Sequence, residues 1–221
     1  MFYFRINQVK IKNNREGRSF LLVGPSNAEV KFFSFVTTEE TTLPDMDEFL
    51  HCDNEVRRRQ IIQSATEKYV GFRKTVPIEN VKDNHILSFG DTGYVLYRSK
   101  NIPQDFNWVF MAIESDRDVR KLGAEMRNVV HDKDFSVFAN NLVMLLAGAA
   151  NPHYLAAAAI GKFVTESLAN NLRQNDDDLI GVLYMSLNRW EHYPHGERKR
   201  DDIPDLTNNM LIDYSIFGIE E

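Results

Sequence analysis

Two groups of carboxylates on either side of a long helix-rich stretch are the clearest candidates for chemistry. Asp116 and Asp118 follow an apolar, strand-like segment at 108–113, and the aspartate run 176–178 precedes a second such segment at 181–187. If these segments pair as neighbouring strands, the carboxylates on both sides meet at one loop tip. Carboxylates held close together repel one another unless a cation lies between them. An all-oxygen cluster suits a hard cation, calcium above all.

A second candidate is a polar loop that contains two histidines. His192 and His195 lie three residues apart, near Glu191 and Glu197. Imidazoles beside carboxylates can bind a transition metal, as in a metal-dependent hydrolase. The spacing matches neither the His-Glu-x-x-His pattern nor a zinc-finger pair, so histidines that only form hydrogen bonds are the other interpretation.

Charge limits the class of partner. The formal net charge of −6 argues against a nucleic-acid protein with a broad basic surface. Two short basic runs, at 57–59 and 198–200, either meet anionic lipid headgroups or form solvated faces. We therefore expect a membrane lipid or a protein as the partner, and no nucleic acid. No pattern indicates the oligomeric state.

These groups must be positioned by a mainly β chain. Apolar and polar residues alternate over 2–11, and Phe33 and Phe35 share one face of a segment whose other face carries Phe32, as in a half-covered sheet. The expected strands lie at 2–11, 19–23, 29–38, 70–75, 85–89, 93–97, 107–114, 181–187 and 210–217, with a polar segment at 188–209. The fold class that they predict is mainly β (α+β), an antiparallel β-sandwich.

Two stretches are helical in character. The segment 45–69 is rich in charge, and Asp45 can cap one solvated helix or two short ones. The segment 119–175 contains many alanines and leucines and lies between two expected strands. The last two strands cannot form a stable hairpin alone, so they belong with the earlier strands. We expect 1–221 to be a single β-sandwich domain with a helical insertion at 119–175.

The edges of this insertion resemble a known family. The chain contains, in order, a strand, Asp-x-Asp, a spacer, Asp-Leu-Ile-Gly and another strand. This order resembles the third calcium loop of the C-two domain, the calcium- and lipid-binding β-sandwich domain of synaptotagmins and conventional protein kinase C. The resemblance implies that Asp116, Asp118 and Asp178 are calcium ligands, with Asp177 beside them. It also implies that Gly181 opens the next strand.

The first loop supports this resemblance in part. The segment SNAEVKFFSFV is similar to the strand that follows the family's first calcium loop. In the places of that loop's aspartate ligands, however, stand Asn13, Asn14 or Glu16, and Asn27. Amides are weaker calcium ligands than carboxylates and bring no charge. The resemblance therefore implies a weak calcium site, and the spacer is far longer than in the family.

The stretch 135–161 contains no Asp, Glu, Lys or Arg. Pro152 divides it into halves that are each too short to span a bilayer, which favours an α-hairpin packed on the sandwich. The residues that we expect to face inward are Leu142, Leu145, Leu146, Leu155, Ile160 and Phe163. The alternative is a membrane-active toxin or effector that releases this hairpin into lipid.

No catalytic signature is visible. The sequence lacks a Gly-x-Ser-x-Gly elbow, a phosphate-binding glycine loop and a Cys–His signature, so we expect a binding module and no enzyme. Its single cysteine, Cys52, excludes an intramolecular disulfide. The first residues lack the basic-then-apolar order of a signal peptide, so we expect a cytoplasmic protein that associates with membranes if its partner is lipid.

Overall fold

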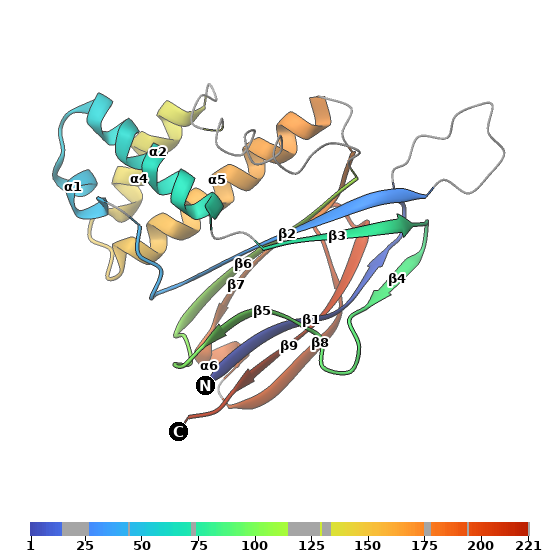
Figure 1. Cartoon of the computed structure of the whole chain (residues 1–221). Coiled ribbons are helices and arrows are strands. Elements are labelled where there is room, and N and C mark those ends of the chain that lie inside the picture. The colour runs from blue at the N-terminus through green and yellow to red at the C-terminus, as the bar shows by residue number, and fades with distance from the viewer. Residues whose placement is uncertain are drawn as a thin grey trace.

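The computed structural model describes residues 1–14, 27–43, 45–71, 74–114, 129, 134–174, 178–193 and 195–220. Within these ranges the chain forms two antiparallel sheets and a group of helices (Figure 1). This confirms the predicted class, mainly β with two packed antiparallel sheets and a helical insertion.

Sheet A has the strand order β4-β1-β9-β8, with β5 beside β4 on the same edge of β1. Alternation of apolar and polar residues runs along the central strand β1, whose inward residues are buried. Its strands are β1 (Phe2–Ile11), β4 (His85–Ser88), β5 (Tyr94–Ser99), β8 (Gly196–Pro204) and β9 (Met210–Gly218).

Sheet B has the order β3-β2-β6-β7, so β7 lies at one edge. Its strands are β2 (Ala28–Thr38), β3 (Lys74–Val81), β6 (Asp105–Glu114) and β7 (Asp178–Asn188). The expected pairing of 108–113 with 181–187 is confirmed, because β6 and β7 are antiparallel neighbours. Glu114, the last residue of β6, is the register partner of Asp178, the first residue of β7.

Sheet B is the middle of three layers (Figure 1). Between the sheets, the rings of Phe4 and Trp108 meet edge to face with centroids 4.7 Å apart. On the other face, Phe35 stacks on Tyr69 of the helical layer with centroids 5.2 Å apart. Strands covered on both sides carry continuous apolar runs. The expectation of a half-covered sheet was therefore wrong for β2, since helices cover its second face.

The helical layer consists of segments from two parts of the chain. The first part, expected as one helix or two, is two: α1 (Met46–His51) and α2 (Glu55–Gly71). The insertion supplies α4 (Phe135–Leu146) and α5 (Pro152–Gln174), and the short α6 (Arg189–His192) follows β7. As expected, the hairpin breaks before Pro152, where Asn151 Oδ1 accepts the N–H of Tyr154 at 3.1 Å.

Three expected boundaries need correction or remain untested. The strand expected at 70–75 is wrong at its start, because α2 continues to Gly71 and β3 begins at Lys74. The segment expected to be only polar, 188–209, contains the strand β8. The strand expected at 19–23 lies outside the described residues.

One inward-facing residue was also predicted wrongly. Leu142, Leu146 and Ile160 are buried as expected, and Leu155 and Phe163 pack against the same core. Leu145, in contrast, has 52% of its surface exposed. The buried stripe of α4 consists of Phe135, Ala139, Leu142 and Leu146, so Leu145 lies on the outer face.

Candidate functional site

The two ends of the insertion leave sheet B at one place, which we call the strand-end tip. It comprises the end of β1, the β3–β4 turn, the end of β6, the start of β7 and the 205–209 connection between β8 and β9. These segments are joined by hydrogen bonds: Asn14 N–H donates to Asp83 Oδ1 at 2.9 Å, and Asn209 Nδ2 donates to Ile180 O at 2.8 Å. The tip is therefore a shared end of both sheets.

The predicted calcium ligands belong to this tip by their position in the chain. The main chain of Asp178 is paired with Glu114, as described above. Asp116, Asp118 and Asp177, as well as Glu16, lie outside the described residues. Within the part of the chain that the structure describes, no three histidine, cysteine or acidic side chains are grouped for a metal ion. The predicted ligand set thus stays a prediction.

The residues expected to replace the first-loop ligands have structural contacts. Asn14 is buried and its Nδ2 donates to Val81 O at 3.0 Å. The N–H of Asn13 donates to Asn209 Oδ1 at 3.0 Å, and its carbonyl accepts Asn209 Nδ2 at 2.8 Å. Asn27 is exposed. The asparagines at 13 and 14 therefore hold the end of β1 to the neighbouring connections.

Asp205 is the centre of the tip, and sequence reasoning did not single it out. This carboxylate is only 5% exposed. Its Oδ2 accepts the N–H of Val182 at 3.0 Å and both the N–H and the hydroxyl of Thr207, at 2.8 and 2.6 Å. Its Oδ1 accepts the N–H groups of Asn209 and Met210, at 2.8 and 2.7 Å. Asp205 therefore ties β7 of sheet B to the β8–β9 connection of sheet A.

Gly181 lies against this carboxylate. A Cβ atom at position 181 would lie 2.8 Å from Asp205 Oδ2 and 2.5 Å from Met210 Cε, closer than real contacts allow. The expectation that Gly181 opens this strand was wrong, because β7 begins at Asp178. Glycine at position 181 is required instead by the close approach of Asp205 and Met210.

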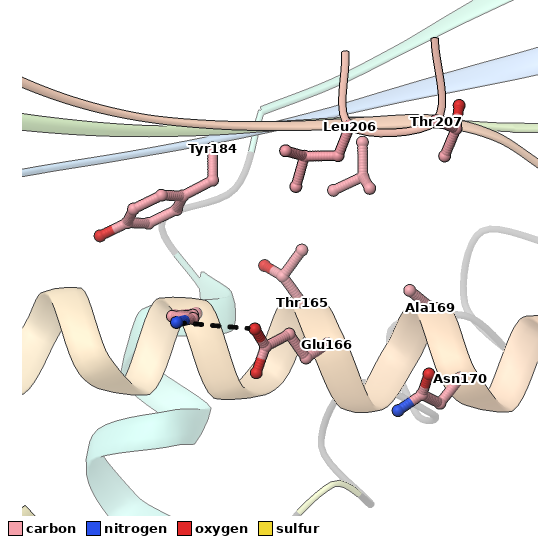
Figure 2. A pocket seen from close by; sticks show the side chains of 9 residues that line it. Thr165, Glu166, Ala169, Asn170, Tyr184, Leu206 and Thr207 are labelled. Atoms are coloured by element: carbon pink, nitrogen blue, oxygen red, sulfur yellow. Dashed lines mark ion pairs between the residues drawn. The ribbon is translucent and has the colours of Figure 1, made fainter. Parts of the chain in front are cut away.

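A cavity of about 580 Å³ adjoins the tip, between α5 and the edge strand β7 (Figure 2). Its helical wall holds an ion pair between Lys162 and Glu166, with nitrogen and oxygen 3.8 Å apart. The Tyr184 hydroxyl donates to Asn107 Oδ1 at 3.4 Å, and burial raises the pKa of Tyr184. The lining residues are Lys162, Thr165, Glu166, Ala169, Asn170, Val182, Tyr184, Leu206 and Thr207. The cavity joins apolar walls to a few polar groups, as ligand sites do.

The two histidines of the polar loop have different neighbours. His192 Nδ1 accepts the N–H of Asn188 at 3.1 Å and lies 4.0 Å from Glu191. His195 Nε2 lies 3.9 Å from Glu220. The first histidine therefore organises the turn after β7, and nothing among the described residues brings the two rings to one ligand.

The basic run at 57–59 lies on α2 and is engaged with acidic side chains. Arg57 forms two 2.6 Å hydrogen bonds to Glu48, which lower the pKa of Glu48 and raise that of Arg57. Arg59 lies 3.2 Å from Glu55. The ion pairs at Arg57 and Arg59 fit a solvated helix face, and contact of this run with lipid headgroups stays a prediction.

The first helix of the uncharged hairpin, α4, packs against α1, α2 and α5 through one side only. On the outer face of α4, Val137, Met144 and Leu145 are all more than half exposed. No helix within the described ranges has both the length and the apolar character needed to cross a membrane.

Comparison with known proteins identifies no family for this chain. No protein-family model matches the chain, and no curated protein sequence matches it significantly.

Proposed function

We propose that this chain is a binding module that takes a divalent cation, calcium, at the strand-end tip. The observation that supports this most is the pairing of Glu114 with Asp178. Two residues of chain span at most about 7 Å, so Asp116 begins close to that pair, and Asp177 precedes it directly. Carboxylates from both ends of the insertion therefore start from one point on sheet B.

Electrostatics favour a cation at this point. Asp116, Asp118 and Asp177 lie within four residues of the Glu114–Asp178 register pair along the sequence. Where such carboxylates converge, their like charges raise the free energy of the ionised state. Calcium relieves this repulsion and accepts six to eight oxygen ligands in flexible geometry. The asparagines of the first loop bring no charge, so we expect a Kd of roughly 10⁻⁴–10⁻³ M.

Calcium-dependent thermal stability tests the proposal. A ligand that binds only the folded state raises the melting temperature, because it stabilises that state by RT ln(1 + [L]/Kd). Millimolar calcium should raise the melting temperature more than equal magnesium does, and Asp116→Asn with Asp178→Asn should abolish this difference.

A matched variant controls for the change in net charge. Asp91→Asn with Glu67→Gln removes two exposed carboxylates away from the tip. This variant should keep the full calcium response. Equal melting curves in calcium and magnesium for the wild type would exclude the site, and so would equal loss of response in both double variants.

A second candidate function is an action on membranes by the hairpin 135–161. The observation that favours it is the exposed apolar face of α4, formed by Val137, Met144 and Leu145. Leakage of a dye from anionic vesicles, reduced by Met144→Ser with Leu145→Ser, would support this function. Absence of leakage with the wild type would exclude it.

A further inference from the structure

The outer edge of β7 is open for two residues. Near the tip, Val182 uses both of its outward main-chain groups: its N–H donates to Asp205, and its carbonyl accepts the N–H of Leu206 at 2.8 Å. The outward direction recurs at every second residue of a strand. Tyr184 and Ser186 therefore present their main-chain groups on this edge, and among the described residues their N–H groups donate no hydrogen bond. The series ends at Asn188, whose N–H His192 accepts.

On its helical side, the open edge of β7 borders the cavity between α5 and β7 (Figure 2). A strand added to β7 would place alternate side chains on the helical side of the sheet, because residues opposite one another share a face. The side chain opposite Tyr184 would enter the cavity, whose apolar contacts include Val182 and Leu206. The next side chain on this face, opposite Ser186, would lie beside Tyr154 of α5, which hydrogen-bonds to Ser186. Leu206 is 74% exposed and thus offers apolar surface that the chain itself does not cover.

The other wall is the edge strand β8. Arg198 and Arg200 are register partners of Ile216 and Tyr214, which are buried between the sheets. The two arginines therefore start from the face of sheet A that points towards sheet B. Both are exposed, and neither forms an ion pair with a described carboxylate, whereas their neighbour Lys199 lies 3.9 Å from Glu197.

Arg200 and the open edge of β7 lie at similar distances from the strand-end tip along their strands. Asp205 binds the N–H of Val182, and from this contact β8 runs back to Arg200 over five residues while β7 runs on to Ser186 over four. At about 3.3 Å per residue, both segments extend some 15 Å from the tip. An added strand on β7 would thus carry its second set of side chains towards Arg200, and Arg198 lies two residues, about 7 Å, further from the tip.

We propose that the edge of β7 binds an extended peptide as an added strand, with apolar residues in the α5 cavity and acidic residues towards Arg198 and Arg200. Main-chain hydrogen bonds to Tyr184 and Ser186 supply affinity, and the two walls select the alternating side chains. Carboxylates paired with arginine form strong charge-assisted hydrogen bonds. This site uses neither calcium nor the predicted calcium ligands, so it stands apart from the function proposed above.

Fluorescence anisotropy with a labelled peptide tests the charge requirement. The probe is a peptide of about seven residues that alternates valine and glutamate, added to the full chain. It should bind saturably, and the same peptide with lysine in place of glutamate should not. Arg200→Glu should weaken binding at least about tenfold, or ~1.4 kcal/mol. The matched variant Lys199→Glu, on the opposite face of β8, should weaken it less than about threefold.

The main-chain contacts need a separate test. Ser186→Pro removes an N–H that is not part of the β6–β7 ladder, a position where an edge strand tolerates proline, and it should abolish binding. N-methylation of the peptide amides gives a test that leaves the protein intact. Methyl groups on one alternate set of amides should abolish binding, and those on the other set should not.

Several outcomes would overturn the proposal. Equal binding of both N-methylated peptides would exclude strand addition, and equal effects of Arg200→Glu and Lys199→Glu would exclude the contact with the arginines of β8. Absence of saturable binding at millimolar peptide would exclude the site. If the wild type self-associates and Ser186→Pro abolishes this self-association, the occupant of the edge is a second copy of the chain instead.

Discussion

Replacing Asp205 by asparagine should destabilise the fold more than any other single charge removal at the tip. The side chain is 5% exposed, and its two oxygens accept five hydrogen bonds from β7 and the 205–209 connection. Asparagine keeps one acceptor oxygen and turns an NH₂ group towards the donors of the other. At least two N–H groups then lose their acceptor in a buried place.

The magnitude follows from those lost contacts. A hydrogen bond to a charged group contributes about 1.5–3 kcal/mol, and a buried donor left without a partner costs about 1–3 kcal/mol. Loss of two such bonds at Asp205 should lower the free energy of unfolding by about 3–5 kcal/mol. That is a large share of the 5–15 kcal/mol typical of a folded domain.

Urea unfolding followed by circular dichroism measures this loss. The matched control is Asp201→Asn, which removes an exposed carboxylate from β8, the strand that precedes Asp205, and should change stability by less than about 0.5 kcal/mol. A loss below about 1 kcal/mol for Asp205→Asn would refute the role assigned to the carboxylate, as would equal losses in both variants.

Three further predictions concern packing and pH. Leu142→Asp places a charge in the core and should lower the free energy of unfolding by more than about 3 kcal/mol. Leu145→Asp, on the outer face of α4, should change it by less than about 0.5 kcal/mol. Equal melting temperatures of the two variants would contradict the assigned faces of α4. Gly181→Ala should cost about 1–3 kcal/mol in urea unfolding, because its Cβ meets Asp205 Oδ2 at 2.8 Å; an unchanged midpoint would show that the connection can move. Burial raises the pKa of Tyr154 to about 12, while the unfolded phenol ionises near pH 10. The unfolded state therefore loses its proton first, and stability should fall as pH rises from about 10 to about 12; a flat profile of urea midpoints would contradict this.

The strands of the core were predictable because burial leaves a two-residue or continuous apolar pattern. The segments at 2–11, 107–114 and 210–217 match β1, β6 and β9 within a few residues. The strand β8 was missed because its residues, GERKRDDIP, carry charge at most positions. It is an edge strand that takes its hydrogen bonds from β9, and charge on an edge blocks further pairing. No apolar pattern marks such a strand.

The faces of α4 were harder to predict for the opposite reason. Its sequence, FSVFANNLVMLL, has no charged residue to mark the solvent side. Spacings of three and four favour Leu145 as well as Leu142 and Leu146, and only contact with α2 and α5 selects the stripe from Phe135 to Leu146. Helix propensity and hydrophobic periodicity describe one helix alone, so they do not predict which neighbouring helices it contacts.

The tip was predictable in outline and not in its central residue. Pairing of the two strands around the insertion follows from their patterns and from the resemblance. Asp205 stands alone in a polar segment, and its only local signal is Thr207 two residues later, a spacing typical of an aspartate turn. Its main partner, Val182, is distant in the sequence, so the buried carboxylate emerges only when the two sheets are placed together.

The long insertion is tolerated because of where its ends lie. Glu114 and Asp178 are register partners, so the inserted chain leaves and returns at one ladder position, and doubling the length of such a loop adds only about 0.6 kcal/mol of closure entropy. In return, α5 covers the face of sheet B that carries Phe33, Phe35 and Met111, and α4 packs on α5. The helix α5 also forms the helical wall of the cavity beside β7. The insertion therefore links the two proposals in physical terms: its ends supply the carboxylates of the tip, and its last helix supplies one side of the peptide site.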